Sequence, residues 1–167
     1  MAKHIISIRV ENQAGVLTRI AGLFSRRKFN IESLAVGVTE VPEVSRITIL
    51  VDGDDYTVDQ VIKQVGKLID VKDIKQLHAS DSISRELTFL KVEASAITRS
   101  EIMQIVDIFR AKIIDVSHTT LTIELTGSYD KVKAFIEMLE PFGIQEIVRT
   151  GTISIERGDK VLTQNLE

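Results

Sequence analysis

Apolar residues alternate with polar ones at the start of the chain. Ile6, Ile8 and Val10 share one parity, which is the period of a strand with one buried face. Beyond a polar loop the spacing changes to that of an amphipathic helix, with apolar residues at positions 16, 17, 20, 21, 23 and 24. The pattern therefore predicts a strand over 4–10, a loop, and a helix over 16–28.

Residues 31–77 add two strands, a helix and a further strand. An extended piece over 31–39 and a strand over 45–51 flank a turn around Pro42. The sequence Thr57-Val58-Asp59-Gln60 has the form of a capping box and predicts a helix start. A short strand over 71–77 completes the order β-α-β-β-α-β, in which helices cover an antiparallel sheet. We expect the buried stripe of the second helix to contain Val58, Val61, Ile62, Val65, Leu68 and Ile69.

The same order of elements begins again after the small, polar stretch 78–82. A second capping box, Thr98-Arg99-Ser100-Glu101, predicts a helix start, and Pro141 with Gly143 predicts the end of the last helix. Strands are predicted over 86–92, 113–117, 119–126 and 144–149. We expect the tail over 151–167 to dock on the folded chain through its apolar residues Ile153, Ile155, Val161 and Leu162.

The repeated order predicts an α+β protein with two tandem ferredoxin-like β-α-β-β-α-β domains. We assign residues 1–78 to the first domain, 79–84 to a linker, and 85–167, with the tail, to the second. A chain of 167 residues suffices for two small domains of this kind.

The composition excludes several classes of function. Hydrophobic residues make up 44% and aromatic residues 5% of the chain, which indicates an aliphatic globular core. A net charge of -3 argues against nucleic acid as the main partner, because phosphate binding needs a basic face. The absence of cysteine excludes disulfides, thiolate catalysis and sulfur-ligated metal. Without a signal peptide or an apolar run that could span a bilayer, we expect a cytoplasmic protein with no membrane partner.

The loop between the first strand and the first helix has the features of a receptor for a small amino acid. Gly15 favours a positive φ, and the free amides of Gly15, Val16 and Leu17 suit a carboxylate at the positive end of the helix dipole. Asn12 and Asn30 supply amide oxygens for an ammonium group. Apolar residues that follow are candidates for the side-chain pocket, namely Ile31, Leu34 and Val36. We predict no catalytic or metal-binding residues, and a ligand site made of Asn12, Gly15, Val16, Leu17, Asn30 and Ile31.

Each of these features also has a purely structural interpretation. Gly15 alone would be a turn residue, and Asn30 alone would be the left-handed cap of a helix. The run Arg26-Arg27-Lys28 is typical of a solvated helix end that compensates the dipole, and the acidic stretch 52–55 is typical of a turn. The three histidines stand singly, without a second ligand at metal spacing.

Longer runs of residues carry a specific resemblance. Asn12-x-x-Gly15-Val16-Leu17 alone would indicate an amino-acid-binding domain of the ACT type. With further runs in both halves, the chain resembles the regulatory (small) subunit of acetolactate synthase, also called acetohydroxyacid synthase. The residues Gln13-Ala14 replace a more usual acidic residue and serine, and residues 162–167 extend beyond the family core. The further runs are Arg19-Ile20-x-Gly22-Leu23-Phe24, Asn30-Ile31-Glu32-Ser33-Leu34, Ser45-Arg46-Ile47-Thr48-Ile49, Arg85-Glu86-Leu87, Leu90-Lys91-Val92, Phe109-Arg110-Ala111, Ile113-Ile114-Asp115-Val116 and Arg157-Gly158-Asp159-Lys160.

The resemblance implies a regulator without catalytic activity of its own. Small subunits of this family raise the activity of a large catalytic subunit, which converts two pyruvate to 2-acetolactate and CO2 in the synthesis of valine, leucine and isoleucine. They also transmit feedback inhibition by a branched-chain amino acid, usually valine. Thiamine diphosphate, Mg and FAD are expected on the large subunit, and no cofactor is expected on this chain.

The resemblance also implies a division of roles and a homodimer. The first domain is expected to bind the effector and contact the large subunit, and the second, from Arg85 onward, to be needed for effector sensitivity. The segment over 33–38 falls on an edge strand and carries no lysine or proline that would block pairing. Two such edges can join into one sheet, with Asn12 and Gly15 of one chain facing Asn30 of the other.

Two other classes of function stay open on the sequence alone. Acylphosphatases are ferredoxin-like enzymes with a loop of similar outline. The residues Gln13-Ala14-Gly15-Val16, with Arg19, are weakly similar to that loop. An amino-acid-sensing transcription or RNA-binding regulator would need a helix-turn-helix segment or stacking aromatics. Beyond Phe89, no predicted strand offers an aromatic platform.

Overall fold

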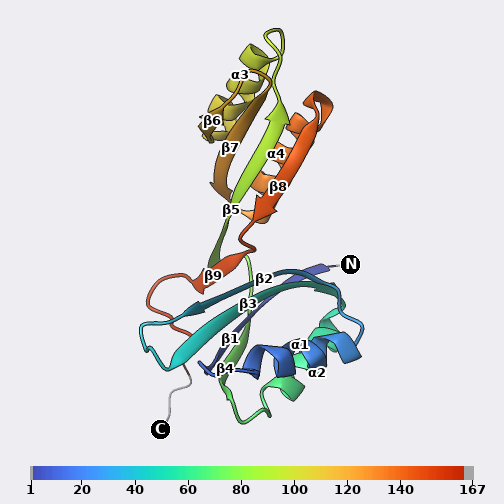
Figure 1. Ribbon diagram of the computed structural model, residues 1–167. Helices are drawn as coiled ribbons and strands as arrows, with labels where there is room; N and C mark the ends of the chain where they lie inside the picture. Colours follow the sequence, from blue (N-terminus) through green and yellow to red (C-terminus); the bar gives the residue numbers. More distant parts are fainter. Residues whose placement is uncertain (1, 164–167) are drawn as a thin grey trace. The chain divides into compact units, whose positions relative to one another are not determined.

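The computed structural model describes residues 2–163, which fold as two compact units. The first unit contains the chain up to Ile83 and again from Gly151, and the second unit contains Ser84–Thr150. Each unit is an antiparallel sheet with two helices packed on one face (Figure 1). The predicted α+β architecture with two β-α-β-β-α-β units is confirmed.

The first unit follows the predicted order of elements. Its strands have the spatial order β2-β3-β1-β4, with every neighbouring pair antiparallel. β2 and β4 are therefore the two edges of this sheet. The elements are β1 (Ala2–Glu11), α1 (Val16–Arg26), β2 (Ile31–Val38), β3 (Val44–Gly53), α2 (Asp55–Val65) and β4 (Val71–Leu77).

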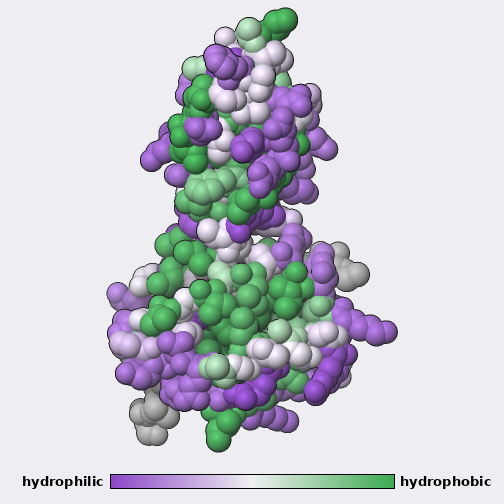
Figure 2. Space-filling model, in the orientation of Figure 1, coloured by the Kyte–Doolittle hydropathy of each residue, from purple (hydrophilic) through white to green (hydrophobic). Residues whose placement is uncertain are grey.

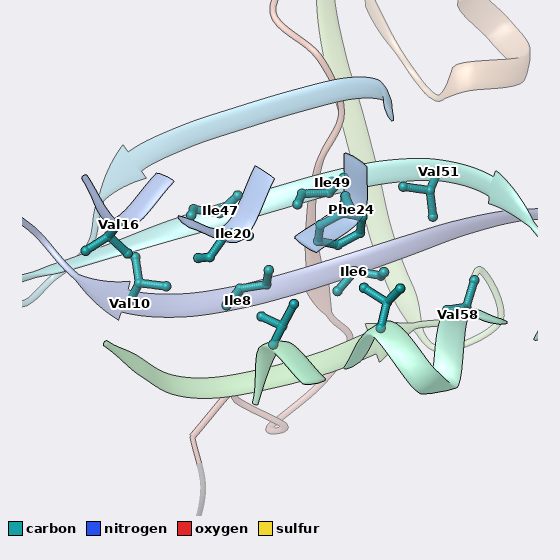
Figure 3. Packing of buried hydrophobic residues seen from close by; sticks show 12 residues of the cluster. Ile6, Ile8, Val10, Val16, Ile20, Phe24, Ile47, Ile49, Val51 and Val58 are labelled. Atoms are coloured by element: carbon teal, nitrogen blue, oxygen red, sulfur yellow. The ribbon is translucent and has the colours of Figure 1, made fainter. Parts of the chain in front are cut away.

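An aliphatic core lies between this sheet and its helices (Figure 3). Ile6 and Ile8 of β1 and Ile20 and Phe24 of α1 are all fully buried in it. Burial of one such side chain contributes about 1.5 to 3 kcal/mol. The alternation and the helical spacing seen in the sequence therefore identify the residues that hold the first unit together.

α2 begins and ends earlier than expected. Its N-cap is Asp54, whose carboxylate accepts a hydrogen bond from the amide of Thr57 at 2.8 Å. The capping box predicted at 57–60 is wrong, because the negative charge of Asp54 already satisfies this amide and suits the helix dipole. The helix ends at Val65, so Ile69, which we expected in the buried stripe, is 97% exposed.

The second unit repeats the order of elements around a core of its own. Leu90, Ile123 and Phe135 are among its buried residues. Its strand order is β6-β7-β5-β8, and β9 (Ile153–Glu156) pairs with β5 outside this path. The other elements are β5 (Ser82–Glu93), α3 (Arg99–Phe109), β6 (Lys112–Val116), β7 (Thr120–Gly127), α4 (Tyr129–Leu139), the 3-10 helix η1 (Glu140–Phe142) and β8 (Ile144–Arg149).

α3 begins at Arg99 with Thr98 as its N-cap, as predicted, and the end of α4 also agrees, but the side chain of Thr98 makes no capping bond to the helix. The hydroxyl of Thr98 accepts from the amide of Ser95 at 3.0 Å, and the hydroxyl of Ser95 accepts from the amide of Thr98 at 3.2 Å. Thr98 therefore bonds to Ser95 before the helix and not, as a capping box over 98–101 would require, to the first turn of α3. Pro141 lies within η1, and Gly143, with φ +95°, follows it, so both mark the end of the last helix as predicted.

The boundaries between the two units differ from the prediction at both crossings. β5 begins at Ser82, so the expected linker over 79–84 is a turn followed directly by strand. The tail was assigned to the second domain, but its residues 151–163 belong to the first unit, and its residues 164–167 lie outside the described part of the chain. The second unit is therefore an insertion in the first, joined to it by two stretches of chain.

We call residues 151–163 the C-terminal strap. The strap crosses the helix-free face of the first sheet, and it contacts all four strands of that sheet. Polar groups make these contacts, since the side chains of β1 that share the parity of Ser7 point away from the helices. The contacts are Thr152 N to Ser33 Oγ at 3.2 Å, Arg46 Nη2 to Ser154 O at 2.8 Å, Lys75 Nζ to Glu156 Oε1 at 2.5 Å, and Arg9 Nη1 to Leu162 O at 3.3 Å.

The expectation that the tail docks on the folded chain is confirmed for the strap. Most of the apolar residues that we expected to make the contact are exposed, however. Leu162 is buried, whereas Ile153, Ile155 and Val161 are each more than half exposed. Apart from Gly151, which has no side chain, the other buried strap residues are polar, namely Thr152, Ser154 and Glu156. A polar sheet face accepts polar partners because buried donors and acceptors must be paired.

Candidate functional site

The loop between β1 and α1 has the backbone that a helix-terminal anion site needs. Gly15 is the N-cap residue of α1 and has φ +86°, as predicted for a position that favours glycine. No side chain caps this helix, so its first amides are left for another acceptor. A Cβ built on Gly15 would meet nothing within 4 Å, which shows that the space beside the helix start is open.

Asn12 is fixed at the base of this loop by two hydrogen bonds to the turn before β3. Its amide donates to the carbonyl of Glu43 at 2.8 Å, and its Nδ2 donates to the carbonyl of Pro42 at 3.1 Å. Since the side-chain nitrogen is used by Pro42, the carboxamide oxygen is the atom that Asn12 can offer to a ligand.

Val16 and Leu17 contribute to the loop in different ways. The side chain of Val16 is only 2% exposed and packs in the core, so only its amide can serve a ligand. Leu17 is 39% exposed and keeps part of its apolar side chain at the surface. Beside them, Arg19 pairs with Asp70 at 2.5 Å, which neutralises the one cation next to the loop on α1. An arginine engaged in this way weighs against the phosphate cradle of an acylphosphatase.

Asn30 and Ile31 lie at the opposite end of the sheet from the loop. Ile31 pairs with Val51 near the end of β3, whereas Val38 pairs with Ser45 near its start, beside the turn that holds Asn12. Seven strand steps of about 3.3 Å separate Ile31 from Val38, or about 23 Å. The structure therefore brings Asn12 together with residues 15–17, but within one chain it does not bring them to Asn30 and Ile31.

One interpretation of the sequence made Asn30 the left-handed cap of α1, but Asn30 does not cap this helix. The helix ends at Arg26. The amide of Arg27 donates to the carbonyl of Phe24 and that of Lys28 to the carbonyl of Ser25, and the positive φ of +58° belongs to Lys28. Asn30 is exposed at the start of β2. Its side chain is therefore available to a partner that comes from outside the chain.

β2 is an open edge of the first sheet, and part of its surface is apolar. It has β3 as its one neighbour in the strand order, and Val36 and Val38 are 48% and 61% exposed. Figure 2 shows a broad apolar area on the visible face of the first unit. The absence of lysine and proline from β2 leaves this edge suited to strand pairing.

Sequence reasoning missed the ionic cluster beneath the C-terminal strap. Glu156 has a side chain that is 3% exposed, and it pairs with Lys75, whereas Arg9 pairs with Asp73 at 3.0 Å. Burial lowers the pKa of the nearby Arg46 below its ordinary value, and the charge of Arg9 lowers this pKa further. The opposite charges in the two distant segments gave a signal, but charges alone do not indicate which pairs will form.

A shallow hollow in the second unit is lined by Ala96, Arg99, Val116, Ser117 and His118. The Nη2 of Arg99 donates to the carbonyls of Ala94, Ser117 and His118 at 2.8 to 3.1 Å, so this cation holds loops together. Among residues 2–163, no group of three potential metal-binding side chains occurs. No helix in this part of the chain is long and apolar enough to cross a membrane.

Two protein families match the two halves of the chain. The acetohydroxyacid synthase (AHAS) small subunit-like ACT domain matches residues 6–73, and the small subunit of acetolactate synthase matches residues 85–158. The first of these ranges contains the loop at Gly15 and the edge strand β2.

Relatives align along nearly the whole chain. A probable acetolactate synthase small subunit from Archaeoglobus fulgidus is 51% identical over 158 residues, which cover 95% of this chain and 99% of that one. The acetolactate synthase small subunit of Mycobacterium leprae is 50% identical over 157 residues, or 94% and 93% of the two chains. The crystal structure of the acetolactate synthase small subunit from Thermotoga maritima superposes with a TM-score of 0.86 at 41% identity, covering 96% of this chain and 100% of that one. The chain therefore belongs to the family of acetolactate synthase small subunits.

Proposed function

We propose that this small subunit has no catalytic activity of its own, that it activates the thiamine-diphosphate-dependent large subunit, and that it makes the enzyme sensitive to valine. The observation that carries the effector site is the uncapped start of α1, where Gly15 has φ +86° and open space beside it. The amides of residues 15–17 bind the carboxylate of the amino acid at the positive end of the helix dipole.

The site is completed by a second copy of the chain. If two β2 edges pair about a two-fold axis, they run antiparallel, and the start of one β2 lies opposite the end of the other. The end of β2 is the end of the sheet at which Asn12 lies. Asn30 and Ile31 of the partner copy therefore approach Asn12 and Gly15 of the first copy, and symmetry produces two such sites.

Each group of the amino acid then has a matching partner. Asn12 and Asn30 offer carboxamide oxygens to the ammonium group, and the apolar side chain lies against Ile31 and the exposed Val36. An apolar pocket distinguishes ligands that differ by one methylene by only about 1 to 3 kcal/mol. We therefore expect leucine and isoleucine to bind more weakly than valine, with a measurable affinity.

The chemistry of the reaction belongs to the partner enzyme. We assign thiamine diphosphate, Mg and FAD to the large subunit and no cofactor to this chain, and we place the complex in the cytoplasm. The ACT domain binds the effector and contacts the large subunit, whereas the second unit is needed for valine sensitivity.

The test is a reconstitution with the large subunit, with acetolactate formation from pyruvate as the readout. Added small subunit should raise the rate, and valine should lower the raised rate. Light scattering on the small subunit alone should show a dimer at micromolar concentration. An unchanged rate with bound small subunit would contradict the activating role, and a monomer with and without valine would contradict the shared site.

A further inference from the structure

The first residues of the C-terminal strap contact the start of β2. The amide of Thr152 donates to the hydroxyl of Ser33 at 3.2 Å, and Thr152 is 1% exposed. Gly151 has φ +83°, and a Cβ added to it would lie 3.2 Å from the carbonyl oxygen of Leu34. The backbone of the strap therefore approaches the backbone of β2 as closely as the lack of a side chain at Gly151 permits.

β2 is irregular at this point. Its register against β3 shifts between Ile31 and Ser33, so that Glu32 is an extra residue in the ladder. Such bulges bend a strand and change the direction of the neighbouring side chains. The proposed ligand residues, Asn30 and Ile31, come immediately before the bulge, and the residues that contact the strap come immediately after it.

The strap has a fixed part and a junction. Glu156 pairs with Lys75, and the carbonyl of Ser154 accepts from Arg46, which anchors the middle of the strap on the sheet. Gly151 is separated from the last residue of β8, Arg149, by one residue. A shift of the backbone at Glu32 therefore acts on the point where the chain leaves the second unit.

We propose that Gly151 and Thr152 sense the conformation of the bulged start of β2 and carry effector occupancy into the second unit. This inference rests on the proposed function, because it assumes that valine binds at Asn30 and Ile31. It assigns valine inhibition to the contact between strap and β2, and it leaves activation of the large subunit independent of that contact.

The test compares Gly151→Ala and Ser33→Ala with the control Gly158→Ala in the full-length protein, reconstituted with the large subunit. Gly158 is also in the strap and has φ +69°, but an added Cβ there would meet nothing within 4 Å. The control therefore carries similar backbone strain without touching β2. Ser33→Ala removes only the hydroxyl that accepts from Thr152, so it tests the contact without backbone strain.

Both test variants should bind valine in calorimetry within about threefold of wild type and should activate the large subunit normally. The valine concentration for half-inhibition should rise at least fivefold, whereas Gly158→Ala should resemble wild type. In wild type, valine should also slow hydrogen exchange at the amide of Thr152, and it should not do so in Ser33→Ala.

Three results would overturn the inference. The first is unchanged inhibition in both test variants, and the second is a loss of valine binding in proportion to the loss of inhibition, which would place these residues in the site itself. The third is an equal effect of Gly158→Ala. A wild-type protein that neither binds valine nor activates the large subunit would remove the proposed function, and this inference with it.

Discussion

The division of the effector site between two copies can be tested by mixing two defective chains. In Gly15→Asp the new carboxylate occupies the place of the ligand carboxylate at the start of α1. In Asn30→Ala an acceptor for the ammonium group is lost, which costs about 1.5 to 3 kcal/mol, or about tenfold to a hundredfold in affinity. Each variant alone should therefore bind valine poorly.

A mixed dimer should regain one good site. Within one chain the two positions lie at opposite ends of the sheet, which along β2 are about 23 Å apart by the rise of about 3.3 Å per residue. If sites form between copies, one site of the mixed dimer carries both changes and the other carries neither. After random exchange, half of the dimers are mixed, so about a quarter of the wild-type number of sites should return.

The assay is a calorimetric titration with valine of each variant and of the two variants unfolded and refolded together. Gly158→Asp is the control for an aspartate at a positive φ, because Gly158 also has an open surround. The control should bind valine as wild type does. A refolded mixture that binds no better than the two separate variants would show that each site is built from one chain, and the shared site would be rejected.

Two further predictions concern the first unit. The hydrogen bonds from Thr57 hold the pKa of Asp54 below its ordinary value of 3.8, so the cap stabilises the fold above that pH and is lost as acid protonates Asp54. Asp54→Ala should lower the melting temperature at pH 7 and make progressively less difference below pH 3.8, and a difference independent of pH would contradict this cap. A chain shortened after Ile83 should melt at a lower temperature than the full chain, and a peptide of residues 151–163 should raise that temperature, because it covers the polar sheet face. The same peptide with Glu156→Gln should raise it less, since the pair with Lys75 is lost; equal melting of the shortened and full chains would show that the strap contributes no stability.

The periodic parts of the fold were predictable because burial on one side decides them. The parity of Ile6 and Ile8 in β1 identified a strand with one buried face, and the helix at Ile20 and Phe24 followed from spacing alone. The positive φ of Gly15 was also predictable, since few other residues accept it.

Neither capping box forms as predicted, because several nearby residues can make the same hydrogen bonds. Asp54 and Thr57 both fit the start of a helix, and the structure selects the residue with the stronger acceptor. For α3, Thr98 is the N-cap as predicted, but its hydroxyl bonds to Ser95 and not to the helix. Sequence spacing identifies where a helix begins to within a few residues, but not which side chain caps it.

The docking of the strap could not be predicted from its pattern. Ile153 and Ile155 alternate with polar residues, and this alternation normally predicts that the apolar side is buried. Here the surface to be covered is polar, since the helices already take the apolar side of the sheet. Alternate residues of a strand face opposite sides, so the strap can turn its polar side chains, Ser154 and Glu156, to the sheet and leave the two isoleucines exposed. The outcome depends on the partner surface, which lies more than 60 residues away in the sequence.

A site shared by two copies links valine binding to dimerisation. Only the dimer offers both Gly15 and Asn30 to one ligand, so valine binds the dimer in preference to the monomer. By thermodynamic linkage, each bound valine must then strengthen the dimer by the factor by which dimerisation strengthens binding at that site. Dilution of the protein should therefore weaken its apparent affinity for valine, and valine should lower the concentration at which dimers form. A site contained in one chain, whose affinity does not depend on dimerisation, would show neither effect, so both effects follow from the shared geometry.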